Sequence, residues 1–160
     1  MDVYSNLVSL LKEKGLTIGF AESLTGGLFA SKIANVSGAS SVLCGGVVSY
    51  TNDVKINVLK VKKETIDKYT EVSYECASEM AKGLKELLKC DIAISLTGIA
   101  GPTGGTEKNP VGTVYCGFFL ENSLYSIRLC FPNTLSRNEI REAVCLKIAK
   151  MLVKKFTKRY

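Results

Sequence analysis

The feature that most constrains the fold is an alternation of segments typical of strands with segments typical of helices. The strand-like runs are short and apolar, whereas the helix-like segments repeat apolar residues every three or four positions. Toward the C-terminus two adjacent strand-like runs predict a hairpin, and Ser136 with Glu139 forms a capping box that opens a last helix. The expected strands are 17–21, 43–50, 91–97, 111–120 and 124–131, and the expected helices are 3–14, one that begins at Ser23 or Thr25, 52–59, 73–89 and one from 136 onward.

This alternation predicts an α/β fold with three layers, α/β/α, in which helices cover both faces of a mixed sheet. A chain of 160 residues is long enough for one hydrophobic core, so we expect a single domain over residues 1–160. Ligands of such folds bind at the carboxyl ends of the strands. Polar and glycine-rich segments that follow the expected strands are therefore the places to look for chemistry.

The chain contains no histidine, which excludes hydrolases with a histidine base and histidine-ligated zinc sites. Its cysteines form no CxxC pair, so a cysteine zinc site is not expected either. Several lie in apolar runs, and we expect reduced cysteines packed in the core of a cytoplasmic protein. No segment has the pattern of a signal peptide or the length of a membrane span. The cysteines are Cys44, Cys76, Cys90, Cys116, Cys130 and Cys145.

The net charge of +6 comes from the C-terminal tail. Residues 147–160 hold six basic residues and no acidic one, so the remainder of the chain is balanced. Cations near a helix C-terminus interact favourably with the helix dipole, and a solvated helix end is the simplest interpretation of the tail. A nucleic-acid partner bound by the tail is the less favoured alternative.

The segment from Ala21 to Gly27, AESLTGG, places a serine between an expected strand and an expected helix. At such a junction the hydroxyl of Ser23 is exposed to a ligand, and the N–H groups of Thr25, Gly26 and Gly27 can bind an anion or a developing oxyanion. The alternative is that Ser23 or Thr25 is a plain helix N-cap. The two glycines favour the functional interpretation, because each costs about 1 kcal/mol in a helix.

A lysine in the second segment is a candidate base. If Thr51 caps the helix at 52–59, Lys55 lies in its first turn, where the helix dipole disfavours a positive charge. A lowered pKa would leave its amine neutral part of the time and able to act as a general base toward a serine. Asp53 opposes that shift, and an ordinary surface lysine remains the alternative.

A glycine- and proline-rich loop at 98–110 and a pair of arginines complete the candidate segments. The loop matches neither the Walker A spacing nor GxGxxG, yet its free N–H groups and hydroxyls suit a phosphate or a ribose. Arg137 and Arg141 lie four residues apart at the start of the last helix, where they can clamp a phosphate or a carboxylate. Neutralisation by nearby glutamates is the alternative for the arginines.

Together these motifs resemble the CinA C-terminal domain family, in its form as a stand-alone nicotinamide-nucleotide amidase. The resemblance covers nearly the whole chain and rests on AESLTGG (21–27), GGVVSYTNDVK (45–55), GIAGPTGG (98–105) with PVGTV (110–114), and SRNEIR (136–141). It implies hydrolysis of the carboxamide of nicotinamide mononucleotide to nicotinate mononucleotide and ammonia, in pyridine-nucleotide salvage. It also implies a homodimer and no metal or organic cofactor.

Position by position, the resemblance implies that Ser23 is the nucleophile, that Lys55 is its base, and that Tyr50 lies beside them and can relay the proton. Ser40 also matches a serine of the family and is a rival nucleophile. Asn109 stands where relatives usually have a lysine, a difference that would weaken substrate binding or alter specificity. Residues expected to contact the substrate are Thr25, Gly26, Gly27, Ser40, Thr97, Gly98, Gly101, Gly104, Gly105, Arg137 and Arg141.

The alternative function is a non-catalytic module that binds nucleotides or proteins, since relatives in this family are linked by name to competence and DNA damage. Ammonia release separates this alternative from an amidase.

Overall fold

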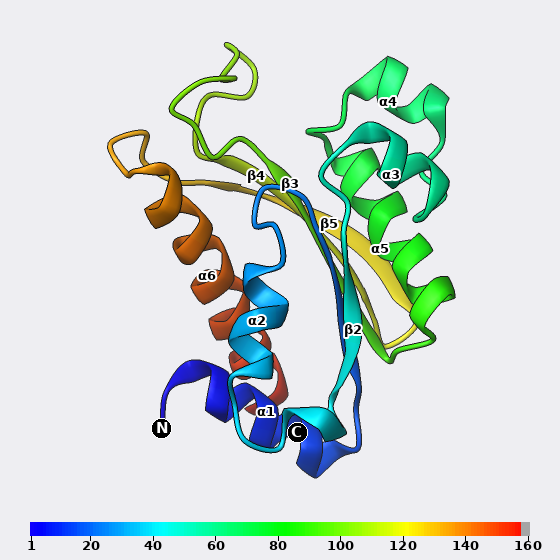
Figure 1. Cartoon of the computed structure of the whole chain (residues 1–160), viewed down its shortest axis with the longest axis vertical. Coiled ribbons are helices and arrows are strands. Elements are labelled where there is room, and N and C mark those ends of the chain that lie inside the picture. Colours follow the sequence, from blue (N-terminus) through cyan, green and yellow to red (C-terminus); the bar gives the residue numbers. More distant parts are fainter. Residues whose placement is uncertain (158–160) are drawn as a thin grey trace.

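A computed structural model describes residues 1–157 of the chain, and its centre is a five-stranded sheet in the order β2-β1-β3-β4-β5 (Figure 1). β1 pairs in parallel with both β2 and β3, whereas β3 with β4 and β4 with β5 are antiparallel. The sheet is therefore mixed, as predicted. The strands are β1 (Ile18–Glu22), β2 (Leu43–Val48), β3 (Ile92–Gly98), β4 (Thr113–Leu120) and β5 (Ser123–Cys130).

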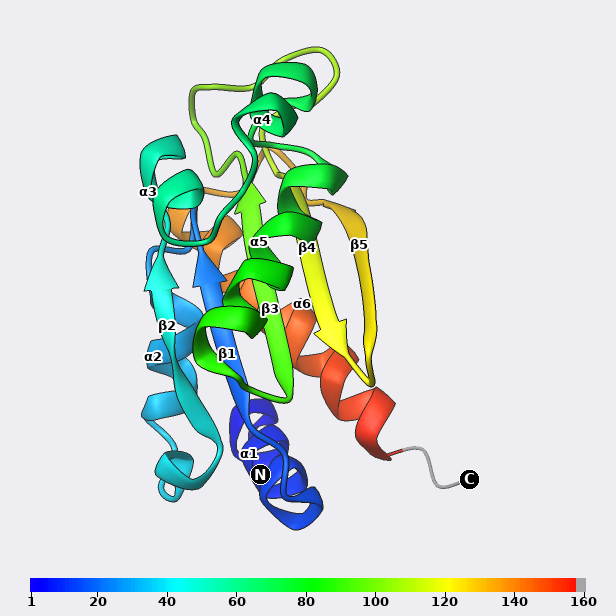
Figure 2. The same cartoon turned by 90° about the vertical axis from the view of Figure 1, so that its right-hand side faces the viewer.

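Helices cover both faces of this sheet, which confirms the predicted three-layer fold (Figures 1 and 2). One face carries α1 (Val3–Lys14), α2 (Leu28–Ala34) and α6 (Arg137–Thr157). The other carries α3 (Asn52–Asn57), α4 (Lys63–Tyr69) and α5 (Tyr74–Leu88). A short 3-10 turn, Ala39–Ser41, precedes β2.

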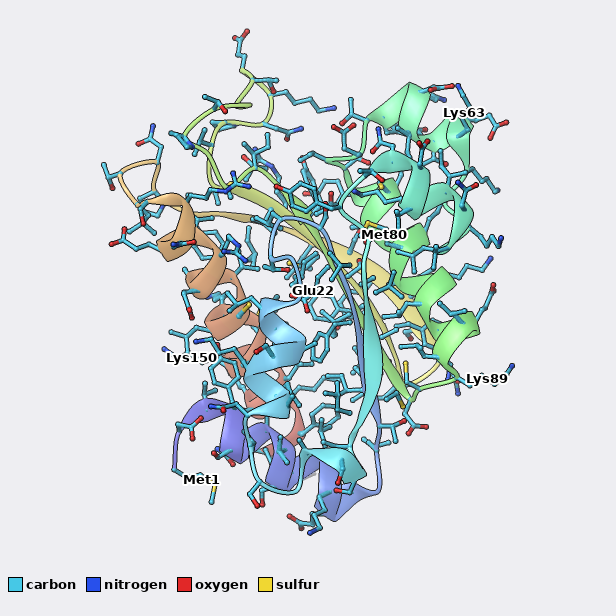
Figure 3. The ribbon with its side chains drawn as sticks, viewed as in Figure 1. Met1, Glu22, Lys63, Met80, Lys89 and Lys150 are labelled. Carbon is cyan, nitrogen blue, oxygen red and sulfur yellow. The ribbon has the colours of Figure 1, made fainter. Side chains whose placement is uncertain are left out.

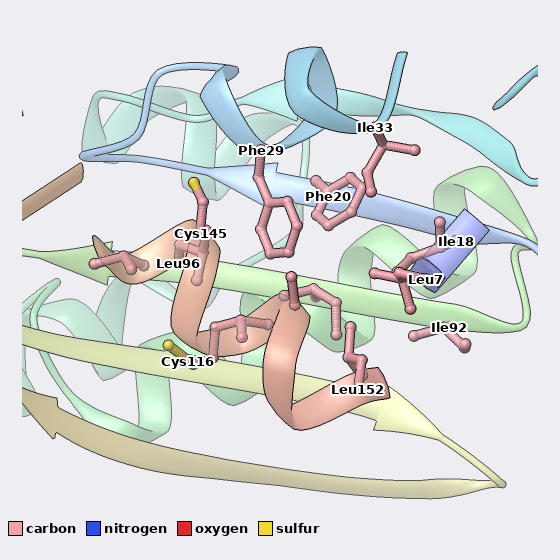
Figure 4. Close-up of a cluster of buried hydrophobic side chains, with 14 of the residues drawn as sticks. Leu7, Ile18, Phe20, Phe29, Ile33, Ile92, Leu96, Cys116, Cys145 and Leu152 are labelled. Atoms are coloured by element: carbon pink, nitrogen blue, oxygen red, sulfur yellow. The ribbon is translucent and has the colours of Figure 1, made fainter. Parts of the chain in front are cut away.

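The core lies between the sheet and each helical layer. On the α1, α2 and α6 side, Phe20 and Phe29 pack with ring centroids 4.4 Å apart and are surrounded by aliphatic side chains (Figure 4). Under α5 a smaller cluster includes Leu59, Met80 and Leu84. Figure 3 shows the labelled lysines at the periphery, whereas Glu22 lies inside the molecule.

The cysteines only partly match their prediction. Cys76, Cys90, Cys116 and Cys145 are buried free thiols, but Cys44 and Cys130 are exposed. These two lie on β2 and β5, the edge strands of the sheet, where one strand face is open to solvent.

Two helix predictions need correction. The second helix begins at Leu28, because Gly26 and Gly27 have φ angles of 59° and 97°, in the left-handed region that glycine adopts readily. Residues 23–27 therefore form turns that separate β1 from the helix. The other correction is α4, a helix that periodicity did not predict.

The register of the parallel strands explains where the candidate residues meet. Glu22 pairs with Val48 of β2 and with Leu96 of β3, so these strands end at one edge of the sheet. Ser23, Ser49 and Thr97 follow these paired positions and lie at that edge. Within residues 1–157, no helix is long and apolar enough to cross a membrane, and no cluster of cysteine, aspartate and glutamate suits a metal ion.

The basic tail lies mostly on α6, which ends at Thr157 with Lys154 and Lys155 in its last turn. This agrees with the favourable placement of cations at a helix C-terminus. Lys158 and Arg159 of the predicted tail lie outside the described residues.

Candidate active site

Ser23 and Lys55 form a buried pair at the end of β1. The Nζ atom of Lys55 donates hydrogen bonds to Ser23 Oγ at 3.0 Å and to the Ser49 carbonyl at 2.8 Å, with a longer contact to the Tyr50 carbonyl at 3.4 Å. Ser23 is 8% exposed and Lys55 only 1% exposed. The two carbonyls accept hydrogen bonds that fix the position of the amine. Of its three contacts, the one to the Ser23 hydroxyl joins it to a group that can react.

Burial lowers the pKa of Lys55, because it removes the water that stabilises the ammonium form. Cys76 and Glu71 act in the opposite direction and raise it, less strongly than burial lowers it. The sequence prediction attributed the lowering to the helix N-terminus. That cause is wrong: α3 has only six residues, and Lys55 lies in its last turn rather than its first.

The turn that follows Ser23 offers free backbone donors. The Gly26 N–H donates to the Ser23 carbonyl at 3.1 Å, so it is engaged within the turn. Among the described residues, the N–H groups of Leu24, Thr25 and Gly27 have no hydrogen-bond partner. Of the predicted trio, Thr25 and Gly27 thus keep unpaired N–H groups, and Leu24, which unlike them lines the pocket, joins them.

Arg141 binds the backbone carbonyls of this turn. Its Nε donates to the Leu24 carbonyl at 3.0 Å and its Nη2 to the Thr25 carbonyl at 2.8 Å. A peptide group is planar and trans, so a carbonyl that faces Arg141 turns the N–H of the same peptide the opposite way. The bond to the Leu24 carbonyl therefore directs the Thr25 N–H away from the arginine. Arg141 itself does not line the pocket.

Arg137 is the arginine that reaches the pocket. Its Nη2 donates to the Tyr50 hydroxyl and its Nη1 to the Gly101 carbonyl, both at 2.8 Å. Tyr50 lines the same pocket as Ser23 and Lys55 and is 55% exposed; its hydroxyl accepts the bond from Arg137, and no hydrogen bond joins that hydroxyl to Ser23 or to the Lys55 amine in the described part of the chain. Only the backbone carbonyl of Tyr50 approaches Lys55.

Glu22 is a buried residue that sequence reasoning missed. It is 1% exposed, and its carboxylate accepts hydrogen bonds from the N–H groups of Phe29 at 2.9 Å and Ala30 at 3.0 Å. These donors are free N–H groups of the first turn of α2, where a negative charge is favoured. Glu22 thereby fixes α2 against the strand that carries Ser23. The sequence feature that could have revealed this role is an acidic residue just before Ser23, followed by a helix whose N-cap, Gly27, has no side chain to bind the first N–H groups.

A pocket of about 490 Å³ opens in front of the Ser23–Lys55 pair. The end of β3 and the loop that follows it form one wall, which includes Gly98, Gly101 and Gly104. A Cβ at position 98 would lie 2.5 Å from the Thr113 carbonyl, so only glycine fits there. The opposite wall is the segment 69–72, which leaves α4.

Several predicted contacts lie elsewhere or have other partners. Ser40 is exposed in the turn before β2, so the length of β2 separates it from the pocket edge. Gly105 lines a neighbouring hollow of about 560 Å³. Thr97 lines the pocket, but its hydroxyl donates to the Glu71 carbonyl at 2.7 Å.

Asn109, at the position where the resemblance implies a lysine, is buried and structural. Its Nδ2 donates to the Val72 carbonyl at 3.1 Å, and its Oδ1 accepts from the Tyr115 hydroxyl at 2.8 Å. The amide therefore ties the glycine-rich loop to the opposite wall. Lys108, the neighbouring residue, lines the pocket instead.

Known families and proteins include clear relatives of this chain. The model of the CinA C-terminal domain family matches residues 2–156. The chain belongs to this family. CinA-like proteins of Pseudothermotoga lettingae and Kosmotoga olearia are 45% and 47% identical over 86% and 88% of the chain. The chain spans about a third of the length of these relatives, 34% in both cases.

Solved structures of the CinA superfamily share the whole fold. The competence damage-inducible protein A of Klebsiella pneumoniae superposes with a TM-score of 0.92 at 28% identity, covering 99% of this chain and 97% of that one. The competence/damage inducible protein CihA of Agrobacterium tumefaciens gives a TM-score of 0.90 at 32% identity, with 99% and 98% covered. These matches extend over nearly the full length of both chains.

Proposed function

We propose that the protein is an amidohydrolase that converts nicotinamide mononucleotide to nicotinate mononucleotide and ammonia. The observation that carries the proposal is the 3.0 Å contact between Lys55 Nζ and Ser23 Oγ, which joins two buried side chains that line a pocket. A lysine whose pKa is lowered by burial is a suitable base for a serine in a chain without histidine. The choice of substrate rests on the family resemblance.

The first half of the reaction forms an acyl-enzyme. The neutral amine of Lys55 takes the proton of the Ser23 hydroxyl, and Oγ forms a bond to the carboxamide carbon. The electron pair of the C=O bond moves to oxygen, where the free N–H groups of Leu24 and Thr25 stabilise the negative charge. Collapse of this intermediate breaks the C–N bond while the Lys55 ammonium gives its proton to the amide nitrogen, which leaves as ammonia.

The second half releases the product. Lys55, again neutral, takes a proton from water, and the water oxygen attacks the ester carbon. Breakage of the bond to Oγ gives nicotinate mononucleotide, and Ser23 regains its proton from Lys55. Arg137 and Lys108 supply positive charge for the phosphate at the pocket wall. Every step uses side chains and backbone groups of this chain.

Ammonia release from nicotinamide mononucleotide tests the proposal. Wild type should release ammonia, and Ser23→Ala should release none. Ser40→Ala is the matched control, because this serine is exposed at the other end of β2, and it should retain wild-type turnover. No ammonia from the wild-type protein would instead favour a module that binds nucleotides or proteins without catalysis. Loss of turnover in Ser40→Ala alone would move the nucleophile to that residue.

We also propose a cytoplasmic location and a homodimer. The free cysteines agree with a reducing compartment, and the dimer rests on the family resemblance.

A further inference from the structure

The charged side chains that line the pocket are mostly basic. Lys55, Lys108 and Arg137 are basic, and Glu71 is the only acid among the described residues of the lining. The Glu71 side chain is half-buried and has no hydrogen bond or ion pair with another described residue. The Glu71 carboxylate on the pocket wall is therefore available to a cationic group of a ligand.

The backbone at Glu71 is held firmly on that wall. The Thr97 hydroxyl donates to the Glu71 carbonyl at 2.7 Å, and Asn109 donates to the next carbonyl, that of Val72, at 3.1 Å. Ser73 adds a third contact, from its hydroxyl to the Thr70 carbonyl at 2.9 Å. Three side chains from the strand, the loop and the N-cap of α5 thus fix the segment that presents the carboxylate.

By itself, the Glu71 carboxylate opposes the chemistry proposed for Lys55. Glu71 raises the pKa of Lys55, whereas the proposed reaction needs a neutral amine. A cationic group bound near Glu71 would cancel that influence and itself disfavour the ammonium form of Lys55. The acid therefore makes chemical sense if the substrate brings a positive charge.

The proposed substrate has such a charge. In nicotinamide mononucleotide the ring nitrogen is bonded to ribose, so the pyridinium ring is cationic, and this nitrogen lies meta to the carbon that carries the carboxamide. When the carboxamide is at Ser23, the ring lies in the pocket that Glu71 and Lys55 both line, and these two charged groups are close enough to interact. The phosphate is left for Arg137 and Lys108, the other cations of the lining.

We propose that Glu71 is a specificity-determining residue whose carboxylate pairs with the cationic pyridinium ring. The substrates of the site are then N-substituted pyridinium carboxamides, and analogues with a neutral ring bind poorly. This inference rests on the proposed function, because it assumes that the carboxamide is placed at Ser23.

Binding of two ring forms tests the inference. Ser23→Ala provides a protein that binds without turnover, and isothermal titration calorimetry measures its affinity for nicotinamide mononucleotide and for the 1,4-dihydro form, whose ring is neutral. Addition of Glu71→Gln should weaken binding of the cationic form by about tenfold, as expected for a partly exposed ion pair. Binding of the neutral form should change by less than about twofold.

Two further variants serve as controls. Glu71→Asp keeps the charge and should keep most of the preference for the cationic ring. Glu75→Gln removes an exposed acid nearby on α5 that does not line the pocket, and it should change neither affinity. Equal thermal melting of all variants shows that the fold is retained.

The outcomes distinguish this inference from the proposed function. Equal weakening of both ring forms by Glu71→Gln would overturn the inference, because the carboxylate would then serve the ribose hydroxyls, which both forms share. No weakening of either form would overturn it as well. Failure of the wild-type protein to release ammonia would overturn the proposed function, while the ring preference would still be read from binding.

Discussion

Replacement of Lys55 by methionine tests whether burial has lowered the pKa of the amine. Methionine is similarly long and unbranched but carries no charge, so it fills the site without a titrating group. Lys55 is 1% exposed, and burial is the largest cause of its lowered pKa. Loss of the hydrogen bonds to the Ser49 and Tyr50 carbonyls shifts the stability of the variant by an amount that does not depend on pH.

The pH dependence has a definite sign. In the unfolded chain the amine titrates near its ordinary pKa of about 10.4, while in the folded chain it titrates lower. Between these two values the unfolded state binds one more proton than the folded state. The free energy of unfolding therefore rises with pH by about 1.4 kcal/mol per pH unit from this residue. Below the pKa of the folded state, Lys55 is protonated in both states, so the free energy of unfolding no longer changes with pH through this residue.

Urea unfolding of wild type and Lys55→Met between about pH 7 and about pH 10 measures this effect. The two proteins differ only at residue 55, so the difference in unfolding free energy reports the titration of Lys55 together with its coupling to Cys76 and Glu71. The free energy of unfolding of wild type should rise relative to that of Lys55→Met as the pH rises. Lys82→Met, at an exposed position of α5, is the control and should leave the pH dependence unchanged. A constant difference between wild type and Lys55→Met across this range would refute the reasoning.

Two other substitutions follow from the structure. Arg141→Gln removes the clamp on the Leu24 and Thr25 carbonyls, so kcat for ammonia release should fall by about 10- to 100-fold with KM little changed; a rise in KM with unchanged kcat would show that this arginine binds substrate instead. Glu22→Gln removes the charge that binds two N–H groups of α2, and the free energy of unfolding in urea should fall by about 1–3 kcal/mol. Glu13→Gln, at the exposed end of α1, is the control, and equal stability of both variants would contradict the role given to Glu22.

The main architecture followed from local pattern. Strand-like runs, the hairpin and the capping box predicted the mixed sheet and its helical layers, because each rests on residues close in the sequence. α4 escaped prediction since it is a short, mostly polar helix with Thr65 as its one buried residue, and its place is set by packing against the rest of the fold. A helix with so small an apolar face leaves no periodic signal.

The sequence predicts the two reacting residues of the site but not the physical cause of the lowered lysine pKa. Ser23 and Lys55 were identified as residue types, and the structure places them in contact across 32 positions of sequence. The cause of the lowered lysine pKa could not be known, since burial depends on residues from several elements that meet only in the fold. The same holds for the Asn109 side chain and for the Glu71 backbone carbonyl, whose hydrogen-bond partners come from distant segments.

The different roles of the two arginines are also a tertiary feature. Their helical spacing predicts a shared face, and both do face the same end of the sheet. Which one reaches the pocket depends on the turn after Ser23, whose carbonyls engage Arg141 and leave Arg137 for Tyr50 and the loop.

The central claim is that Ser23 forms a covalent acyl intermediate with the substrate, and rapid acid quench followed by peptide mass spectrometry tests it most directly. With nicotinamide mononucleotide present, the account predicts the mass of a nicotinate mononucleotide acyl group on the peptide that contains Ser23, and no such mass in Ser23→Ala. Turnover with an acyl group found on the peptide that contains Ser40, or the same adduct persisting in Ser23→Ala, would contradict it.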